Sequence, residues 1–466
     1  MFLTPFLLLL GATVAGAAIS DYPAEKQLTH GPGGRVLTNT HPWSPDSRYL
    51  AFDTRGEKDT SGYDGTRIEL LDVHSGHVRN IYTSKNGAGC LVVTFHPTKN
   101  TLVFILGPEH PTPDWKYGFA HRQGVMVDAD HPGKAVNLEA RNITSPFTPG
   151  SLRGGSHVHV FSADGECVSF TYNDHVLPLE LKPDAPADAQ IDQRNVGVAF
   201  LKKGPVHVPK TSIRNHDGAA FTILATRTVN HPKPGSDEIE KAYEEGWIGH
   251  NGYIKPDGTR QKRALAFQGD LYTADGKRIS EVFVADLPED VTVNPEDGTL
   301  AGTETHRPLP PKGTVQRRLT HTADRKFPGL GGTPRQWLRS APDGSRIAFM
   351  MHDDAGIVQL FTISPNGGEP VQITHNDFSI TSSFNWSPDG SHIAYAADGC
   401  ICITDVATGK TDRLTAKRSD PLDAPGAECV DWSPNGKQIA FLRHLEDTPG
   451  GHRSSHIFVV DVPGTK

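Results

Sequence analysis

Two histidines one residue apart, His157 and His159, have the spacing that sends both side chains to one side of a β-strand. Imidazole nitrogens bind divalent metals at about 2.0–2.1 Å, so such a pair can give two ligands to one ion. The expected ion is Mn²⁺, Ca²⁺ or Zn²⁺, and no motif for an organic cofactor is present. A His-x-His pair can also be a hydrogen-bonded core feature, and that alternative stays open.

The segment just before the histidine pair is suited to binding an anion. Arg153 is followed by two glycines, which let a ligand approach the backbone, and its guanidinium offers a fork of donors to a carboxylate. An ordinary loop with a solvated arginine is the alternative interpretation. We therefore expect either an acidic oligosaccharide or another small anionic ligand here, or no ligand at all.

A second polar group closes the hairpin that begins at His159. Tyr172, Asp174 and His175 bring a phenol, a carboxylate and an imidazole to one strand end, although polar strand ends are also common without any function. With Arg153, the side chains of Tyr172 and His175 are the candidate catalytic residues. They suit β-elimination from a uronate, in which a cation neutralises the carboxylate, a base takes the adjacent proton and an acid assists the leaving oxygen.

A repeated turn sequence predicts the scaffold that positions these residues. An aromatic residue, Ser-Pro-Asp-Gly or a variant of it, and then an alternating apolar run recur along the chain. The copies begin at Trp43, Phe95, Phe161, Ser340, Trp386 and Trp432. The last three are 46 residues apart, close to the roughly 40–50 residues of a four-stranded blade. The sequence predicts an all-β fold with a single β-propeller, seven-bladed by the best count and six-bladed as the alternative.

The long interval between the third and fourth copies should hold a further blade with insertions. We expect its strands around residues 220–228 and 282–287, and an inserted helical or loop segment near residues 230–265. Within it, Ser236 can cap a helix that runs to Trp247. Because the first strand of each blade lies nearest the axis, His41 in another blade is predicted to be the third metal ligand beside the pair.

The ends and the charge of the chain limit its location and partners. Residues 1–18 have the apolar run and small residues of a signal peptide, with a short membrane anchor as the alternative, so residues 19–466 should form the propeller in the periplasm or outside the cell. No later stretch has the length of a membrane span. A net charge of -8 argues against nucleic acid as a partner, whereas a protein partner stays open.

The repeat resembles that of TolB-like propellers. The segments Leu152–Ser162, Ser169–Val176, Pro234–Trp247 and Asp353–Leu360 further resemble YidR-type proteins, a resemblance that implies a propeller but no particular reaction. A more distant similarity is to oligogalacturonate lyases, in which a His-x-His pair ahead of a Phe and a Pro-Asp turn helps to hold a divalent metal. Here the spacing to Phe161 is one residue shorter, and Gly154 stands where that family has a Gln ligand.

These observations lead to two hypotheses about function. The first is a periplasmic or secreted carbohydrate-active propeller, a metal-assisted lyase that acts by β-elimination on acidic oligosaccharides. The second is a non-catalytic TolB-like propeller that binds a partner or serves as an envelope scaffold. A polar site that converges on the axis favours the first, and an ordinary channel favours the second.

Overall fold

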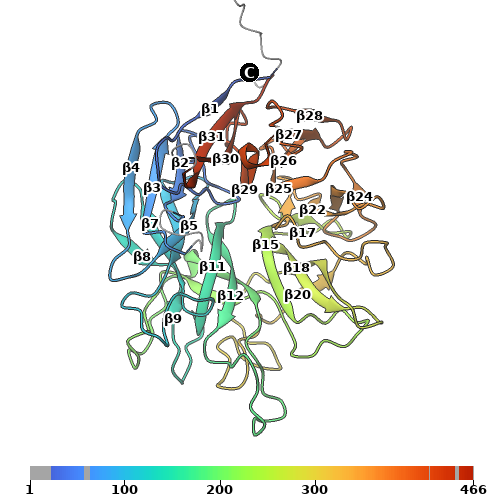
Figure 1. Cartoon of the computed structure of the whole chain (residues 1–466). Helices are drawn as coiled ribbons and strands as arrows, with labels where there is room; N and C mark the ends of the chain where they lie inside the picture. Colours follow the sequence, from blue (N-terminus) through green and yellow to red (C-terminus); the bar gives the residue numbers. More distant parts are fainter. Residues whose placement is uncertain (1–21, 57–62, 419, 447–450, 465–466) are drawn as a thin grey trace, which may run out of the picture.

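The protein is a ring of seven antiparallel blades around a central axis, seen here in a computed structural model that describes residues 22–56, 63–418, 420–446 and 451–464 (Figure 1). The predicted all-β, seven-bladed propeller is therefore confirmed. No α-helix occurs in the described residues, which contain only two 3₁₀ turns, η1 (Leu201–Lys203) and η2 (Pro421–Asp423). The described part of the chain likewise contains no helix long and apolar enough to cross a membrane.

The strands follow one another along the chain, from the inner to the outer edge of each blade. Blade one consists of β2 (Tyr49–Asp53), β3 (Arg67–Asp72) and β4 (Val78–Thr83). Blade two consists of β5 (Cys90–Phe95), β6 (Thr101–Leu106), β7 (Gln123–Asp128) and β8 (Ala135–Asn137). Blade three consists of β11 (Gly154–Phe161), β12 (Cys167–Asp174), β13 (Asn195–Phe200) and β14 (Phe221–Leu224). In blade one, residues 36–43 take the innermost place through single bridges to β2.

The remaining blades keep this order. Blades four to seven consist of β15 (Lys241–Trp247), β18 (Ala264–Tyr272), β19 (Arg278–Asp286) and β20 (Val315–Arg318); β21 (Arg339–Ser340), β22 (Ile347–His352), β23 (Val358–Ile363) and β24 (Val371–Gln372); β25 (Ile380–Trp386), β26 (His392–Ala397), β27 (Cys400–Asp405) and β28 (Thr411–Arg413); and β29 (Pro425–Trp432), β30 (Gln438–Glu446), β31 (Arg453–Asp461) and β1 (Glu25–Gln27). Short pairs outside the blades are β9 (Ala140–Arg141) with β10 (Ser151–Leu152), and β16 (Tyr253–Ile254) with β17 (Arg260–Gln261).

The N-terminal strand closes the ring. β1 pairs with β31, so the two ends of the described chain complete blade seven together (Figure 1). Glu25 of β1 also forms an ion pair with the buried guanidinium of Arg443 in β30, at 2.9 Å. A second arginine, Arg418, lies 3.5 Å from the same carboxylate. The ring is thus closed by hydrogen bonds and ion pairs between residues far apart in the chain.

The repeated turn sequence joins neighbouring blades as well as neighbouring strands. In the sixth blade, the Ser387 hydroxyl accepts a hydrogen bond from the His392 N–H, and Gly390 adopts a φ of 73°, which favours glycine. The indole N–H of the aromatic residue before this turn donates to a carbonyl on the innermost strand of the preceding blade. Four tryptophans do so at 3.0–3.2 Å: Trp43, Trp247, Trp386 and Trp432.

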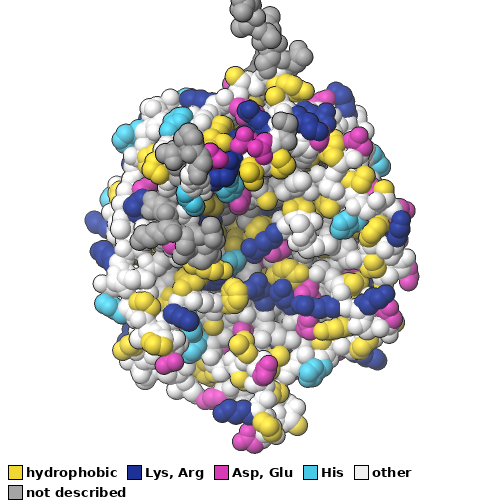
Figure 2. All heavy atoms as spheres, viewed as in Figure 1, with side chains coloured by type: hydrophobic (Ala, Val, Ile, Leu, Met, Phe, Trp, Pro, Cys, Tyr) yellow, Lys and Arg dark blue, Asp and Glu magenta, His cyan; other side chains and the backbone are white. Residues whose placement is uncertain are grey.

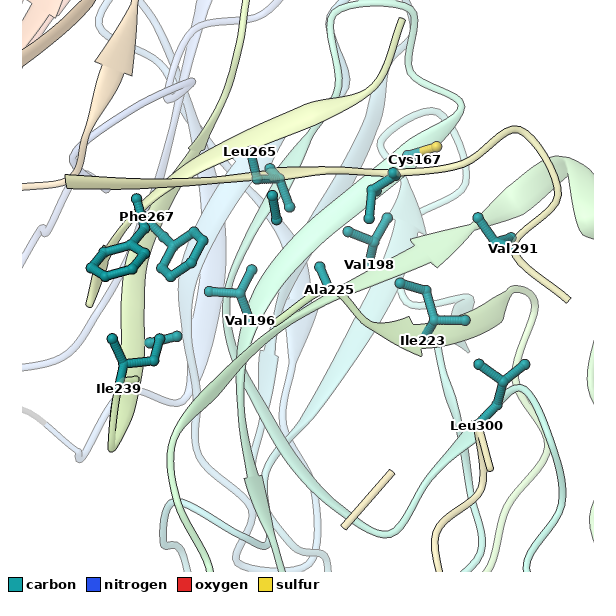
Figure 3. Close-up of a cluster of buried hydrophobic side chains, with 14 of the residues drawn as sticks. Cys167, Val196, Val198, Ile223, Ala225, Ile239, Leu265, Phe267, Val291 and Leu300 are labelled. Carbon is teal, nitrogen blue, oxygen red and sulfur yellow. The ribbon is translucent and has the colours of Figure 1, made fainter. Parts of the chain in front are cut away.

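Apolar side chains fill the space between adjacent blades. Figure 3 shows the cluster between blades three and four, where Val196 and Val198 of β13 face Leu265 and Phe267 of β18. Each of these four side chains is buried, and burial of a large aliphatic side chain contributes about 1.5–3 kcal/mol. The blades therefore form one continuous core that fixes the geometry of the axis.

The segment between the third and fourth copies of the turn sequence differs from the prediction. The helix predicted from Ser236 to Trp247 was wrong: this segment is a turn followed by β15, the innermost strand of blade four. Apolar residues four positions apart share one face of a strand as well as of a helix, so their spacing did not distinguish the two. A β-bulge around Glu244 (φ 55°) adds one residue to this strand. Residues 220–228 do not begin a blade of their own either, since they contain β14, the outer strand of blade three.

Candidate functional site

The axis of the ring has two chemically different ends. The turn face carries the Ser-Pro-Asp-Gly turns and holds a cavity of about 540 Å³ to which all seven blades contribute. His41 lies open to this cavity, and its pKa is lowered to about 4 by burial, by Arg339 and by His250. The opposite end, which we call the loop face, carries the connections between the second and third strands, which are long in blades one to three.

The two histidines of the His-x-His pair do not share a side of their strand. Val158 between them has a φ of 54°, and the register of β11 against β12 shifts between His157 and Val160. This bulge turns the two imidazoles apart. His159 is fully buried, with Nε2 2.9 Å from the Ser156 hydroxyl, whereas His157 is only partly buried and has no hydrogen-bond partner among the described residues. The expectation of a shared face was wrong because sequence spacing does not reveal a bulge.

These histidines therefore do not fit the predicted three-histidine metal site. His41 faces the turn-face cavity, His159 bonds to Ser156 inside the protein, and His157 lies among arginines. No group of three or more His, Cys, Asp or Glu side chains in the described residues is arranged to hold a metal ion.

Arg153 and Tyr172, two of the predicted catalytic residues, belong to a buried group. The guanidinium of Arg153 is fully buried, donates twice to Asp174 at 2.6 and 3.1 Å, and donates to the Thr303 carbonyl with its third nitrogen. The Tyr172 hydroxyl donates to the same carboxylate at 3.0 Å. Burial and Asp174 raise the pKa of Tyr172 well above 10. Every nitrogen of Arg153 is thus engaged within the protein.

His175, the third predicted catalytic residue, lies outside this buried group. Its Nδ1 is 3.1 Å from Nε2 of His121, and both rings contact Trp115. Burial, with the neighbouring His121 and Arg141, lowers the pKa of His175 to about 4, although Asp174 opposes this. The sequence-predicted residues are therefore divided among separate environments and do not converge on one point.

The loop face instead brings together residues that the sequence did not single out. We call this group the arginine mouth: Arg122, Arg194 and Arg335 with His157. Arg122 precedes β7, Arg194 precedes β13 and Arg335 lies shortly before β21, and these strands belong to three different blades. In Figure 2, Lys and Arg side chains gather around the central hollow of this face.

The charges of the arginine mouth are only partly compensated. Arg122 is 2% exposed, its Nε has no hydrogen-bond partner, and no described carboxylate lies within ion-pair distance of it. Burial lowers the pKa of Arg122, and Arg194 lowers it further. Arg335 pairs with Glu244 at 2.5 Å. A buried guanidinium without a carboxylate is costly, so the arrangement favours an anion at this place.

Two further features make the arginine mouth suited to a ligand. Burial and then the three arginines hold the pKa of His157 well below 6.5, so its imidazole is neutral at neutral pH and one ring nitrogen carries a free lone pair. Phe119 is 54% exposed, and the centre of its ring lies 5.0 Å from the guanidinium carbon of Arg122 and 4.9 Å from that of Arg194. Its ring offers an apolar platform beside the cations. The only sequence signal for Arg122 and Arg194 is a position directly before an apolar run.

Comparison with solved structures shows the same kind of fold. An oligogalacturonate lyase in complex with manganese aligns with a TM-score of 0.54 at 12% sequence identity, covering 96% of this chain and 95% of that one. An oligogalacturonate lyase from Vibrio parahaemolyticus aligns with a TM-score of 0.50 at 11% identity, covering 94% and 93%. At these identities the likeness concerns the propeller fold alone.

Comparison of sequences gives a much stronger match. Residues 89–216 match the family described as "Protein of unknown function (DUF3748)", and this segment includes Arg122, His157 and Arg194. The Escherichia coli (strain K12) protein called "Uncharacterized protein YidR" is 45% identical over 431 residues, which cover 92% of this chain and 97% of the bacterial protein. This identity over nearly the whole length of both proteins means that the chain belongs to the YidR family.

Proposed function

We propose that this propeller binds an acidic oligosaccharide at the arginine mouth and cleaves it as a lyase by β-elimination. The observation that carries the proposal is the buried Arg122, which has no carboxylate partner among the described residues and lies beside a neutral His157 that has no hydrogen-bond partner among them. The distant likeness to oligogalacturonate lyases agrees with this substrate class. Arginine suits a carboxylate because its planar fork of donors matches the two oxygens.

In this proposal each side chain has one task. The guanidinium groups of Arg122 and Arg194 bind the uronate carboxylate and neutralise the charge that develops when the adjacent C–H bond breaks. The neutral imidazole of His157 takes the C5 proton, the electron pair forms the C4–C5 double bond, and the C4–O bond breaks. The leaving oxygen receives a proton from water. Phe119 packs against the apolar face of a sugar ring.

The test is incubation of the purified protein with a panel of uronate oligosaccharides. We expect the ultraviolet absorbance of a C4–C5 unsaturated uronate to appear with at least one of them. His157→Gln should lower kcat by about 10²–10⁴-fold with little change in KM, because it removes the base and leaves the arginines in place. Thr171→Ser, a similarly small change on the neighbouring strand β12, is the control.

Other results would point elsewhere. Binding of the oligosaccharide without an unsaturated product would contradict the lyase and favour the non-catalytic binding propeller. Absence of binding to every uronate would contradict both parts of the proposal and favour a TolB-like scaffold with a protein partner. Loss of activity in a chelator with recovery on adding Mn²⁺ would contradict a reaction carried by these side chains alone.

We also propose that the protein acts in the periplasm or outside the cell. The signal peptide predicted for residues 1–18 lies outside the described residues, so the support is its sequence pattern. N-terminal sequencing of protein recovered from the periplasmic fraction should find a chain that begins near Ala18. Recovery of the full-length chain from the cytoplasm would contradict export.

A further inference from the structure

A second cavity lies directly beside the arginine mouth. It has a volume of about 420 Å³, and blades four and five line it on the loop face. Its walls include Tyr243 of β15, Ser280 of β19 and the glycine-rich segment 329–332. Arg335 and Glu244 belong to its wall as well, so their ion pair stands between the cavity and the rest of the arginine mouth.

The charges of this cavity are internally balanced, unlike those of the arginine mouth. Arg278 pairs with Asp270 at 2.6 Å and with Glu240 at 2.6 Å. Lys241 lies 4.0 Å from Asp270, and Arg335 is paired with Glu244. Because each of these cations already has a carboxylate, an added anion would have to displace one of them. The cavity therefore disfavours a charged ligand.

Its polar groups match the hydroxyls of a neutral sugar. The Tyr243 hydroxyl donates to Asp270 at 2.8 Å and lies 2.8 Å from the Ser280 hydroxyl, which also donates to Asp270. Carboxylates accept and guanidinium groups donate hydrogen bonds, so paired groups of this kind can satisfy both the O–H and the oxygen of a sugar hydroxyl. A cavity with a few convergent polar groups is a typical small-ligand site.

We propose that this cavity is the subsite for a neutral sugar next to the uronate, so that the substrate is a mixed glycan in which acidic and neutral residues adjoin. The inference rests on the proposed function, because it needs the carboxylate of the acidic residue at the arginine mouth. One glycan chain would then place its acidic ring beside Arg122 and its neutral ring beside Ser280. A polymer of uronates alone would bring a second carboxylate into a cavity where every cation is paired.

The experiment compares two oligosaccharides of equal length by calorimetry, one made only of uronates and one of alternating uronate and neutral sugar. We expect the alternating compound to bind at least about tenfold more tightly, a difference of about 1.4 kcal/mol. Ser280→Ala should remove most of that preference by weakening binding of the alternating compound alone, without changing binding of the uronate oligomer. Ser391→Ala, an equally small change on the turn face, is the control, and thermal melting of each variant checks folding.

The outcomes separate the two proposals. Equal binding of both oligosaccharides, or tighter binding of the pure uronate, would overturn the neutral subsite while the proposed function stands. An equal effect of Ser280→Ala on both compounds would also overturn it. Absence of binding to either compound would contradict the proposed function itself.

Discussion

Replacing Arg122 by Met separates the stability of the fold from the function of the arginine mouth. Met keeps most of the length and apolar volume of the side chain but removes a buried charge for which the described part of the chain supplies no carboxylate partner. Replacing even a buried ion pair by apolar side chains is often neutral or stabilising by about 1–4 kcal/mol, and an unpaired charge has no attraction to a partner to lose. Loss of the contact between the guanidinium and the Phe119 ring costs about 0.5–2 kcal/mol. We expect the free energy of unfolding to stay level or to rise by about 2 kcal/mol.

The expected change in melting temperature is small. An unfolding entropy of about 2 cal/mol/K per residue over 466 residues converts 1 kcal/mol into about 1 °C. Scanning calorimetry should therefore find the Tm of Arg122→Met equal to that of the wild type or about 2 °C higher. Arg227→Met is the matched control, because Arg227 is exposed and already paired with Asp297, so its loss should change neither stability nor binding by more than about 0.5 kcal/mol.

Binding should change in the opposite direction. Removing one partner of a desolvated charge pair weakens binding by about 2–5 kcal/mol, so Arg122→Met should raise the Kd of an acidic oligosaccharide by about 30-fold or more. Calorimetric titration of the wild type and both variants measures this. A variant that unfolds at much lower temperature would show that Arg122 holds the fold together, and a variant that is stable but binds normally would show that the ligand does not use Arg122. Either result would contradict the role of Arg122 as an anion-binding group that the fold does not need.

Three further predictions concern groups away from the arginine mouth. Asp174→Ala leaves a buried guanidinium without its carboxylate, so it should lower the free energy of unfolding in urea by about 3–5 kcal/mol. Tyr172→Phe should lower it by about 1 kcal/mol and leave turnover unchanged. A large loss of kcat in Tyr172→Phe would instead identify Tyr172 as a catalytic residue. Burial raises the pKa of Asp431 to about 8, so between about pH 4 and pH 8 the folded state holds a proton that the unfolded state has lost. The free energy of unfolding should therefore fall as the pH rises through this range. Asp431→Asn should flatten this fall, and an unchanged pH profile in the variant would contradict the assignment. Glu25→Gln weakens the ion pair to Arg443 that helps to close the ring, so it should lower the free energy of unfolding by about 1–3 kcal/mol. Amide hydrogen exchange in blade seven should become faster, and unchanged exchange there would contradict this role.

The sequence alone predicted the fold, with seven blades as the best count and six as the alternative. The evidence for the fold was local. The turn sequence after Trp386 contains a proline, which fixes φ, and a glycine, which accepts a positive φ, and both effects are properties of single residues. The 46-residue spacing then gave the length of a blade. The helix predicted around Glu244 was wrong because apolar residues four positions apart share one face of a strand as well as of a helix.

The candidate site was decided only by the tertiary structure. Arg122, Arg194 and Arg335 are far apart in the chain and follow no motif, and they meet because ring closure brings the ends of three blades to one axis. The bulge at Val158 turns the side chains of His157 and His159 apart. The buried guanidinium of Arg153 forms an ion pair with Asp174. Local sequence specifies turns and strands, whereas long-range packing determines which charges lack a partner, and that is why the chemistry of this axis could not be predicted from the sequence.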